Sequence, residues 1–485
     1  MFKLTHGSTD GFPDTVAFLD WLNKLPPAWQ SFFTADREMI VTRAPGRMDV
    51  MGGIADYSGA LVLQLPTAVA THVALQRRPD RRVRIVSLAV EVGAPARTYE
   101  MGLEEFGTLA APLAYEEACA RFQRKPDLQW AAYVTGAFLV LLRERGFVCD
   151  EGVNLLIRSR LPEGKGISSS AALEVAVMQA LLAAYGIEVA PREVAFLCQT
   201  LENRVAGAPC GVMDQMTAMC GEADQLLALL CQPGELQEPV QLPVGLAVWG
   251  IDSGIRHAVS GNDYGTVRTA AFMGYRILAE LAGLKCESAE TPGKVRIEDP
   301  LWNGYLANLS AAGFEQTYAP FLPQRLTGAD FLKQYQGITD PVTTVELART
   351  YPIAAATRHP IYEQERVSLF AELLRHWQDE SNARLLGELM YASHASYSAC
   401  GLGSDGTDEL VRLAREAGPA KGIFGAKITG GGSGGTVAFL GRPEAEEVVE
   451  SIAHQYAVNT KREPLGIRGS SAGAAKFGFL RLQKE

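Results

Sequence analysis

The segment that most constrains the fold is residues 161–176, which read LPEGKGISSSAALEVA. Before it, residues 153–160 (VNLLIRSR) have the apolar, β-branched character of a strand. After it, residues 171–185 are rich in Ala, Leu, Glu and Met, which favour a helix, and Gly186 stands where a helix ends. The sequence therefore predicts a strand, a glycine-containing turn and the N-terminus of a helix.

This corner has the chemistry of an anion site, most often for phosphate. Ser168, Ser169 and Ser170 stand where helix caps belong, and the free amides and dipole of a helix N-terminus favour negative charge. Gly164 and Gly166 allow the backbone to approach an anion closely. The alternative interpretation is a corner that binds nothing. The spacing fits neither a Walker A loop, since Gly rather than Ser or Thr follows the lysine, nor a GxGxxG dinucleotide motif.

Composition narrows the class of protein. The 485 residues allow two or three domains, and 47% hydrophobic with 21% charged residues is ordinary for a soluble globular protein. A net charge of −10 without a basic block argues against a nucleic-acid partner, and no apolar run reaches the length of a membrane span. Scattered cysteines without a CxxC pair, together with a start that lacks a signal pattern, predict a cytoplasmic protein.

Several strands and loops are predicted along the rest of the chain. Residues 39–43 form a short strand that the APGR segment breaks, and strands are expected at 60–65 and 72–76. Residues 284–360 are Pro-rich, polar and weakly periodic, which indicates a long excursion with a few short helices. A glycine-rich loop within 419–435 precedes another strand.

Other candidate residues are less specific by themselves. Trp130 and Tyr133 lie one turn apart on a predicted helix, where core packing is the first interpretation. Glu202 lies near the end of another predicted helix. Asp214 lies among small and apolar residues, which suits a paired buried carboxylate or a catalytic one. An isolated aspartate such as Asp56, in an irregular segment, is usually a turn former.

Three motifs now occur in a known order: PGR with DY a few residues later, PxGxGxSSSA, and a late TGGGxGG. This order resembles the GHMP kinase superfamily, and APGRMDVMGGIADYSG is most similar to the corresponding segment of its galactokinase branch, APGRxNxIGEHTDYNG. The resemblance implies an α+β fold of two lobes with the active site between them. We expect an N-terminal lobe at 1–240 and a C-terminal lobe at 241–485, which carries the 284–360 insertion.

The resemblance also implies roles for individual residues. Asp214 would lie beside the anomeric hydroxyl of a sugar, paired with Arg47, which faces the transferred phosphoryl group. Ser170 and Glu202 would ligate Mg²⁺, which prefers such hard oxygen donors. The implied ATP-binding residues are Gly164, Gly166, Ser168, Ser169, Ser170, Trp130, Tyr133, Gly431 and Gly432. The implied sugar-binding residues are Asp56, Gly53, Ile54, Gly211 and Tyr264, with Arg256, His257, Asn262 and Asp263 in the same region as Tyr264.

The chain departs from galactokinases where these carry Glu and His in GEHTDY, because Gly53 and Ile54 stand there. In the family those two residues hold the sugar's 6-hydroxyl. L-Arabinose shares the configuration of D-galactose at the common ring centres and lacks that CH₂OH group. The segment MDVMGGIADYSG, with TRHPIYEQERV, also resembles the kinase domain of plant L-arabinokinases.

We therefore expect an ATP-dependent sugar 1-kinase that makes β-L-arabinose 1-phosphate. A galactokinase and a catalytically silent, sugar-sensing homologue are the alternatives. No nucleic-acid or membrane partner is expected, and the sequence leaves the oligomeric state open.

Overall fold

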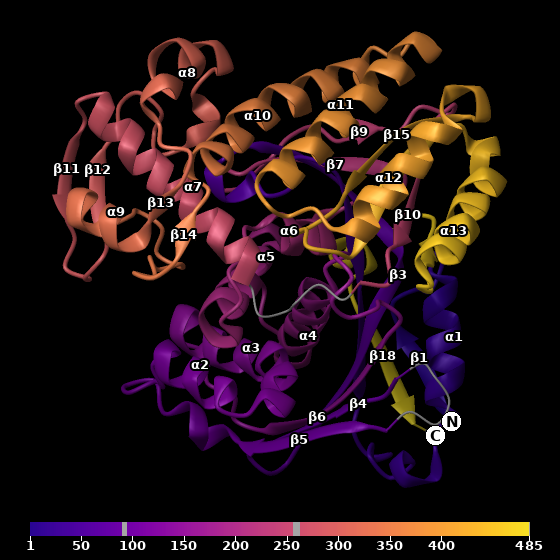
Figure 1. The fold of residues 1–485 in the computed structure, drawn as a ribbon. Coiled ribbons are helices and arrows are strands. Elements are labelled where there is room, and N and C mark those ends of the chain that lie inside the picture. The colour runs from indigo at the N-terminus through magenta and orange to yellow at the C-terminus, as the bar shows by residue number, and fades with distance from the viewer. Residues whose placement is uncertain (90–94, 256–261, 485) are drawn as a thin grey trace.

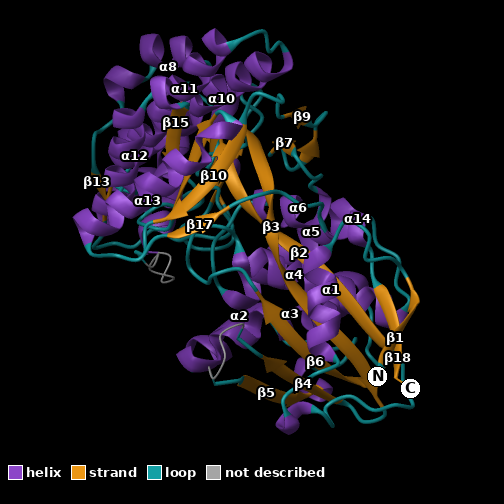
Figure 2. Cartoon of the chain, turned by 90° about the vertical axis from the view of Figure 1, so that its right-hand side faces the viewer, coloured by secondary structure: helices purple, strands orange, loops and turns teal. Residues whose placement is uncertain are grey.

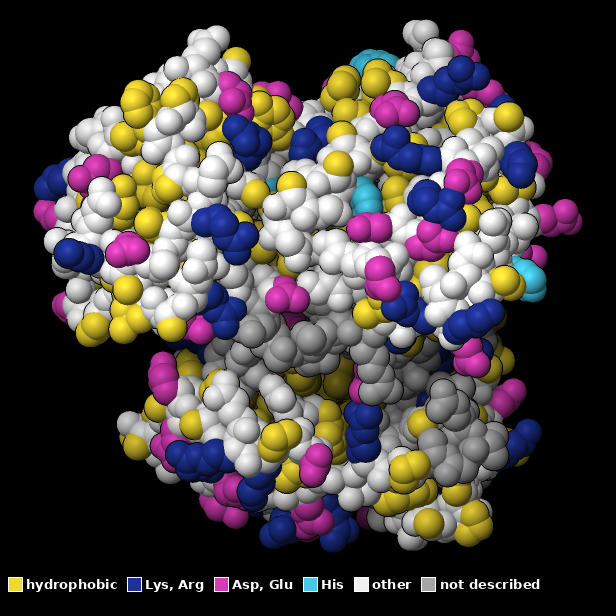
Figure 3. Space-filling model, viewed as in Figure 1, with side chains coloured by type: hydrophobic (Ala, Val, Ile, Leu, Met, Phe, Trp, Pro, Cys, Tyr) yellow, Lys and Arg dark blue, Asp and Glu magenta, His cyan; other side chains and the backbone are white. Residues whose placement is uncertain are grey.

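The computed structural model describes residues 1–89, 95–255 and 262–484. Arg256 and His257 therefore lie outside the described residues. Two β-sheets with helices packed on them organise the chain, and helix and sheet alternate irregularly along it (Figure 1). This arrangement confirms the predicted α+β class. Acidic and basic side chains are interspersed over the face of the molecule shown in Figure 3.

The larger sheet holds most strands of the first half of the chain. Its central path follows the order β1 (Phe2–His6), β18 (Leu480–Lys484), β2 (Met39–Met51), β3 (Leu61–Arg78), β6 (Gly152–Ser159), β4 (Arg82–Ser87) and β5 (Arg97–Gly102). Beside the start of β3 lie β7 (Gln225–Leu230), β8 (Glu235–Leu236) and β9 (Val240–Gln241). Because β18 pairs with β1 and β2, the last strand of the chain lies in the sheet of the first half (Figure 1).

The predicted break in the strand at residues 44–47 is wrong. Strand β2 runs unbroken through Pro45 and Gly46, because a register shift between Pro45 and Arg47 absorbs the irregularity in its pairing with β3. A Cβ on Gly46 would overlap the carbonyl oxygen of Ile167, so glycine allows β2 to run directly beneath the corner. The two strands predicted at 60–65 and 72–76 are likewise one long strand, β3.

Helices cover both faces of the larger sheet. On one face lie α2 (Tyr115–Gln123), α3 (Gln129–Arg145), α4 (Ser169–Tyr185), α5 (Pro191–Leu201) and α6 (Met213–Cys220), while α1 (Pro13–Leu22) lies on the other (Figure 2). The short α14 (Ala474–Phe477) packs beside α6. Helix α5 continues as a short π-helix over Glu202–Ala206. The apolar sides of α3, α4, α5 and α6 form one buried core with β2, β3 and β6.

The smaller sheet carries the helices of the second half. Its strand order is β15 (Ile423–Ile428), β16 (Thr436–Gly441), β10 (Ala247–Asp252) and β17 (Leu465–Ile467). Helices α11 (Glu380–Ala399) and α12 (Asp405–Ala417) pack on β15, and α13 (Glu446–Thr460) packs beside α12 and β17. The long helices α7 (Asn262–Leu281) and α10 (Ile353–Arg375) pack against each other.

The excursion at 284–360 forms a group of elements packed beside α7, at the left of Figure 1. It contains the predicted short helices, α8 (Ala311–Thr317) and α9 (Gly328–Tyr335). It also contains two small antiparallel pairs, β11 (Lys285–Ser288) with β12 (Val295–Glu298), and β13 (Leu326–Thr327) with β14 (Thr350–Tyr351).

Short 3₁₀ turns complete the described structure at Pro27–Trp29, Asp56–Ser58, Leu103–Phe106, Pro126–Leu128, Leu306–Asn308, Ala319–Phe321, Pro419–Lys421 and Pro443–Ala445. All eight cysteines lie in the described part of the chain and are free thiols. Across the described ranges, no helix combines the length and the apolar character that spanning a membrane would need.

Candidate active site

A cavity of about 350 Å³ lies between the helices of the larger sheet, the start of α7 and the β15–β16 loop. It brings together most of the residues that the sequence singled out. These are Arg47, Asp56, Trp130, Tyr133, Gly164, Gly166, Ser168, Ser169, Ser170, Glu202, Gly211, Asp214, Tyr264 and Gly431. Gly53, Ile54 and Gly432 do not line it.

The glycine–serine corner, residues 164–170, has the predicted form of a turn between a strand and a helix. Strand β6 leads into it, α4 begins at Ser169, and Gly164 and Gly166 have φ of 70° and 74°. Ser168 occupies the N-cap position in a left-handed conformation, but its hydroxyl makes no capping bond to the helix. The first-turn amides of α4 are therefore not satisfied by a side-chain cap, which is the condition for an anion to bind there.

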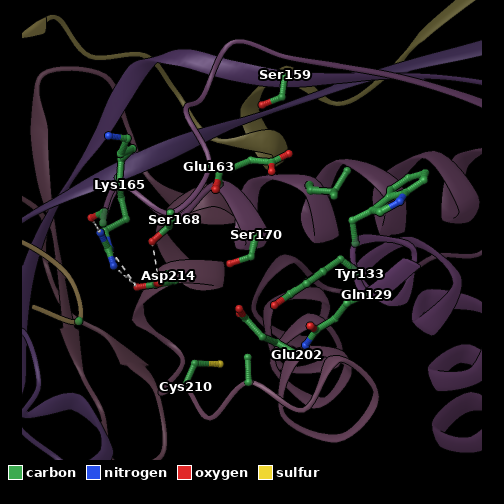
Figure 4. A pocket seen from close by; sticks show the side chains of 18 of the residues that line it. Gln129, Tyr133, Ser159, Glu163, Lys165, Ser168, Ser170, Glu202, Cys210 and Asp214 are labelled. Atoms are coloured by element: carbon green, nitrogen blue, oxygen red, sulfur yellow. Dashed lines mark hydrogen bonds and ion pairs between the residues drawn. The ribbon is translucent and has the colours of Figure 1, made fainter. Parts of the chain in front are cut away.

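The hydroxyl of Ser168 is instead directed at Asp214 (Figure 4). It donates to Oδ2 of Asp214 over 2.6 Å, while Nε and Nη2 of Arg47 lie 2.9 and 2.8 Å from Oδ1. Nη1 of Arg47 donates to the carbonyl oxygen of Gly166 over 2.7 Å. One guanidinium thus joins the carboxylate to the glycine–serine corner.

The two charged members of this group differ in exposure. The side chain of Arg47 is 3% exposed and that of Asp214 is 19% exposed, so the carboxylate is the member open to a ligand. Although burial lowers it, the carboxylates of Asp214 and Asp49 raise the pKa of Arg47 above its ordinary value. A hydroxyl placed beside Asp214 would meet an acceptor held at fixed position by two donors.

Glu202 lies across the cavity from this group, and its carboxylate and the Ser170 hydroxyl face the same space (Figure 4). Nε2 of Gln215 donates to Glu202 over 2.5 Å and to the buried Glu174 over 3.1 Å. Burial and the charge of Asp214 raise the pKa of Glu202 to about 7, against hydrogen bonds from Ser170, Cys210 and Gln215.

These oxygens fit a magnesium ion bound together with nucleotide phosphates. Mg²⁺ typically takes one or two protein oxygens and keeps water and phosphate as its other ligands. A carboxylate with a raised pKa and a hydroxyl on the same side of the cavity meet that need, because a cation there would favour the ionised form. Within the described residues, no group of three His, Cys, Asp or Glu side chains forms a site that the protein alone would complete.

The Asp56 wall, formed by Asp56, Gly211 and Tyr264, lines another side of the cavity. A Cβ on Gly211 would overlap the Asp56 carboxylate, so glycine permits their close approach. Burial, and then the charge of Asp214, raise the pKa of Asp56 to about 7. Its buried Oδ1 has no hydrogen-bond partner among the described residues. Such an acceptor suits a ligand that brings hydroxyl donors.

Gly53 and Ile54 face the protein interior. A Cβ on Gly53 would overlap the Tyr397 hydroxyl, and Oδ2 of Asp49, which is ion-paired with Lys427, lies on the same side. Ile54 has a φ of 53°, is fully buried, and belongs to the apolar cluster that includes Tyr397. The predicted direct contact of these two residues with a ligand therefore has no counterpart in the cavity.

The late glycine motif forms the loop between β15 and β16. Gly431 lines the cavity, whereas a Cβ on Gly432 would overlap Leu402, on the side away from it. Gly430 lies against the carbonyl oxygen of Gly166, with which a Cβ would collide. The loop therefore packs directly on the glycine–serine corner, 264 residues earlier in the chain.

Trp130 and Tyr133 meet both interpretations of their sequence pattern. Both line the cavity from the first turns of α3, and both also pack against the main apolar core. Two aromatic side chains therefore line the cavity while they stay packed against the core, which suits contact with a flat aromatic ligand.

Other lining residues carried no signal that the sequence argument used. Lys165 lies in the corner itself, and its ammonium pairs with the nearly buried Asp252 of β10 over 2.7 Å. Arg97 and Glu163, an exposed ion pair, lie at the rim. The lysine could have been suspected from its place between two glycines, but its partner could not, since no motif connects the two positions.

Comparison with known proteins agrees with this geometry. The family described as GHMP kinases N terminal domain matches residues 132–222, and the family described as GHMP kinases C terminal matches residues 370–458. The first match contains the glycine–serine corner, Glu202 and Asp214. The chain belongs to the GHMP kinase superfamily.

Two curated relatives of this chain are named as sugar kinases. The chain is 42% identical to an L-arabinokinase of Arabidopsis thaliana over its whole length, and it spans about half (52%) of that relative. It is 29% identical to a galactokinase of Chloroflexus aggregans, with 87% of this chain and 89% of that one covered.

Solved structures share the GHMP kinase fold. A galactokinase of Lactococcus lactis in complex with galactose superposes with a TM-score of 0.69 at 20% identity, covering 93% of this chain and 99% of that one. A mevalonate kinase of Methanococcus jannaschii gives a TM-score of 0.51 at 13% identity, covering 89% and 98%.

Proposed function

We propose that the chain is an ATP-dependent sugar kinase that phosphorylates the anomeric hydroxyl of L-arabinose to β-L-arabinose 1-phosphate. The observation that carries the proposal is the group formed by Arg47, Asp214 and Ser168, which lies between the glycine–serine corner and the Asp56 wall. Phosphoryl transfer needs in-line placement, charge neutralisation and a group that orients the nucleophile, and this cavity offers residues for each.

On the nucleotide side, the first-turn amides of α4 and the turn at Gly164 and Gly166 would hold the phosphates. The aromatic faces of Trp130 and Tyr133 would hold the base. Ser170 and Glu202 would hold Mg²⁺, which supplies charge neutralisation to the phosphates when bound. Gly431 would close the cavity from above the corner, while the predicted contact of Gly432 is indirect, through the fold of its loop.

On the sugar side, Asp56 and Tyr264 would bind ring hydroxyls, and Gly211 would give Asp56 room. Asp214 would orient the anomeric hydroxyl and accept its proton. Arg47 would hold that carboxylate in place through the hydrogen bond from Nε and the ion-pair contact from Nη2, both to Oδ1. Oδ2 of Asp214 accepts a hydrogen bond from the Ser168 hydroxyl, so the substrate hydroxyl would share this oxygen with Ser168.

Two observations favour the pentose. The first is the relationship to L-arabinokinase. The second is the space beside Gly53, where Tyr397 and Asp49 leave no room for the glutamate that galactokinases carry in the resembling motif. The preference would then come from the packing behind the cavity wall rather than from a contact made by Ile54.

The test is turnover of purified protein with ATP, Mg²⁺ and a panel of aldoses. We expect kcat/KM for L-arabinose to exceed that for D-galactose by about tenfold or more, the usual size of discrimination by one carbon group in a pocket. The reverse order would support a galactokinase, the second candidate, which the 29% identity to the Chloroflexus aggregans galactokinase favours. Absence of turnover with every aldose would support a silent, sugar-sensing homologue.

The cellular setting of the proposed enzyme follows from its chemistry. ATP and free thiols are maintained in the cytoplasm, and all eight cysteines of this chain are unpaired in the described structure. We therefore place the proposed reaction in the cytoplasm, with sugar and ATP as its small-molecule partners. We also propose two lobes that divide near residue 240. Because β18 pairs with β2 in the first sheet, the end of the chain would belong to the N-terminal lobe.

A further inference from the structure

The excursion at 284–360 is joined to the cavity through a shared apolar core. Buried side chains of the excursion, among them Trp302, Phe314 and Phe331, form one cluster with α7. Tyr57, the residue after Asp56, belongs to the same cluster. The excursion therefore packs against the back of the Asp56 wall rather than standing apart from it.

One ion pair crosses from the excursion to α7. Both carboxylate oxygens of Asp340 accept hydrogen bonds from Arg268, each over 2.8 Å, and the two side chains are 0% and 7% exposed. The amides of Val342 and Thr343 and the Thr343 hydroxyl also donate to Asp340. A bidentate pair of this kind fixes the plane of the guanidinium.

The same guanidinium also contacts a residue that lines the cavity. Nη1 of Arg268 donates to the carbonyl oxygen of Cys210 over 2.9 Å. The side chain of Asn203 holds the same residue, donating to its carbonyl oxygen over 3.2 Å and accepting from its amide over 2.8 Å. Cys210 and Gly211 line the cavity, and Gly211 lies against the Asp56 carboxylate.

We infer that Arg268 is a positioning residue for sugar binding and that the excursion, through Asp340, holds it in place. The loop at 207–212 has Asp56 on one side and leads into α6, whose second residue is Asp214. Its position therefore sets where Asp56 stands relative to the carboxylate that would act on the sugar. This inference rests on the proposed function for its substrate, but the loop contacts do not depend on it.

The test uses the full-length variant Asp340→Asn, which keeps the side chain's shape and removes its charge. We expect KM for L-arabinose to rise by about tenfold or more, while KM for ATP stays within about twofold, because displacement of a positioning group by a fraction of an ångström is enough to lose such factors. Glu298→Gln is the matched control, since it makes the same chemical change at an exposed ion pair of the excursion. That variant should behave as wild type.

A merely structural role would give a different pattern. If Asp340 only stabilised the fold, both KM values would change together or neither would, and the inference would be overturned. In the double variant Arg268→Gln with Asp340→Asn, KM for L-arabinose should rise no further than in Arg268→Gln alone, because Asp340 acts through Arg268. If the two substitutions instead raised KM by independent factors that multiply, Asp340 would not act through Arg268 and the inference would be contradicted.

Hydrogen exchange reads the loop without any substrate. In Asp340→Asn, amides at 207–212 should exchange at least about tenfold faster, while those in the middle of α4 stay protected. Unchanged exchange at the loop would overturn the inference. If the wild-type protein phosphorylates no aldose, the proposed function fails while this measurement still decides the loop's anchoring. If Asp340→Asn does not fold, Thr343→Val removes a single hydrogen bond to Asp340 and should shift the same readouts in the same direction.

Discussion

The glycine–serine corner and the Asp56 wall face the same cavity, yet they are built in different ways. The corner lies within residues 164–170, and its form follows from a local succession of strand, glycines and helix. The wall takes Asp56, Gly211 and Tyr264 from three distant segments, and α7, the excursion and α11 pack behind it. A motif can thus specify the corner by itself, whereas the wall depends on what packs behind the motif.

Gly53 and Ile54 show this difference most directly. They belong to the same motif as Asp56, which lines the cavity, whereas they do not. Both residues pack against the protein interior because of Tyr397, which lies more than 300 residues later. Its hydroxyl fills the space beside Gly53, and its side chain shares an apolar cluster with Ile54. Positive φ at Ile54, unfavourable for a β-branched residue, is held by complete burial of its side chain.

The largest expected effect tests the group that links the two regions. Asp214→Asn keeps the shape of the side chain but removes the charge that Arg47 and a substrate hydroxyl would share. We expect kcat to fall at least about a hundredfold, the loss typical of a single preorganised group. Steady-state kinetics with L-arabinose, and sugar binding by calorimetry, would measure it. Near-native kcat with sugar bound would exclude Asp214 as the proton acceptor.

Gly53→Ala tests the packing behind the wall. Its Cβ would overlap the Tyr397 hydroxyl, so we expect a loss of about 1–3 kcal/mol in the free energy of unfolding, as in other overpacked cores. Denaturant unfolding measures it. Gly466→Ala is the control, since a Cβ there meets nothing within 4 Å and should change stability by no more than about 0.5 kcal/mol. Equal stability of the two variants would show that residue 53 has more space than the structure gives it.

Trp130→Ala sharpens the comparison from the nucleotide side. We expect KM for ATP to rise by about tenfold, the usual cost of losing one aromatic face beneath a base, with KM for sugar nearly unchanged. Initial rates with each substrate varied in turn would measure this. A change confined to KM for sugar would mean that the two ends of the cavity are assigned in the wrong order.

The last expected effect concerns pH at the wall and is small near neutral pH. Burial and the charge of Asp214 raise the pKa of Asp56 to about 7, and its ionised form would accept the sugar hydroxyls. Below that value the carboxyl is protonated in the free enzyme, so kcat/KM for sugar should fall by up to about tenfold per pH unit as pH decreases. In Asp56→Asn the profile should lose this step. A wild-type profile that is flat between pH 5 and 8 would contradict the role.

Much of the fold could be predicted from the sequence because local composition decides the helices. The helix after the glycine–serine corner begins and ends close to the predicted residues, and Gly186 caps it in the left-handed conformation. The continuity of β2 through residues 44–47 could not be predicted. A bulge in the pairing with β3 accommodates Pro45 and Gly46 without ending the strand. The propensity of a segment can be judged from its own residues, but the strand with which it pairs cannot.

The candidate site divides along the same line. The glycines, serines and Asp214 follow from motifs, but the bond from Ser168 to Asp214 arises because β2, α4 and α6 meet at one point. The pairing of Lys165 with Asp252 and of Arg268 with Asp340 likewise joins segments that no motif connects. Such contacts depend on tertiary packing, which only the structure supplies.

The central claim is that both regions serve one reaction at the anomeric carbon. It is tested most directly by incubating the protein with ATP, Mg²⁺ and L-arabinose labelled with ¹³C at C1, and recording the product by NMR. The account predicts a β-anomeric C1 signal that is split by coupling to phosphorus, together with an equal amount of ADP. Phosphate on any other carbon, or ADP formed without a phosphorylated sugar, would contradict it.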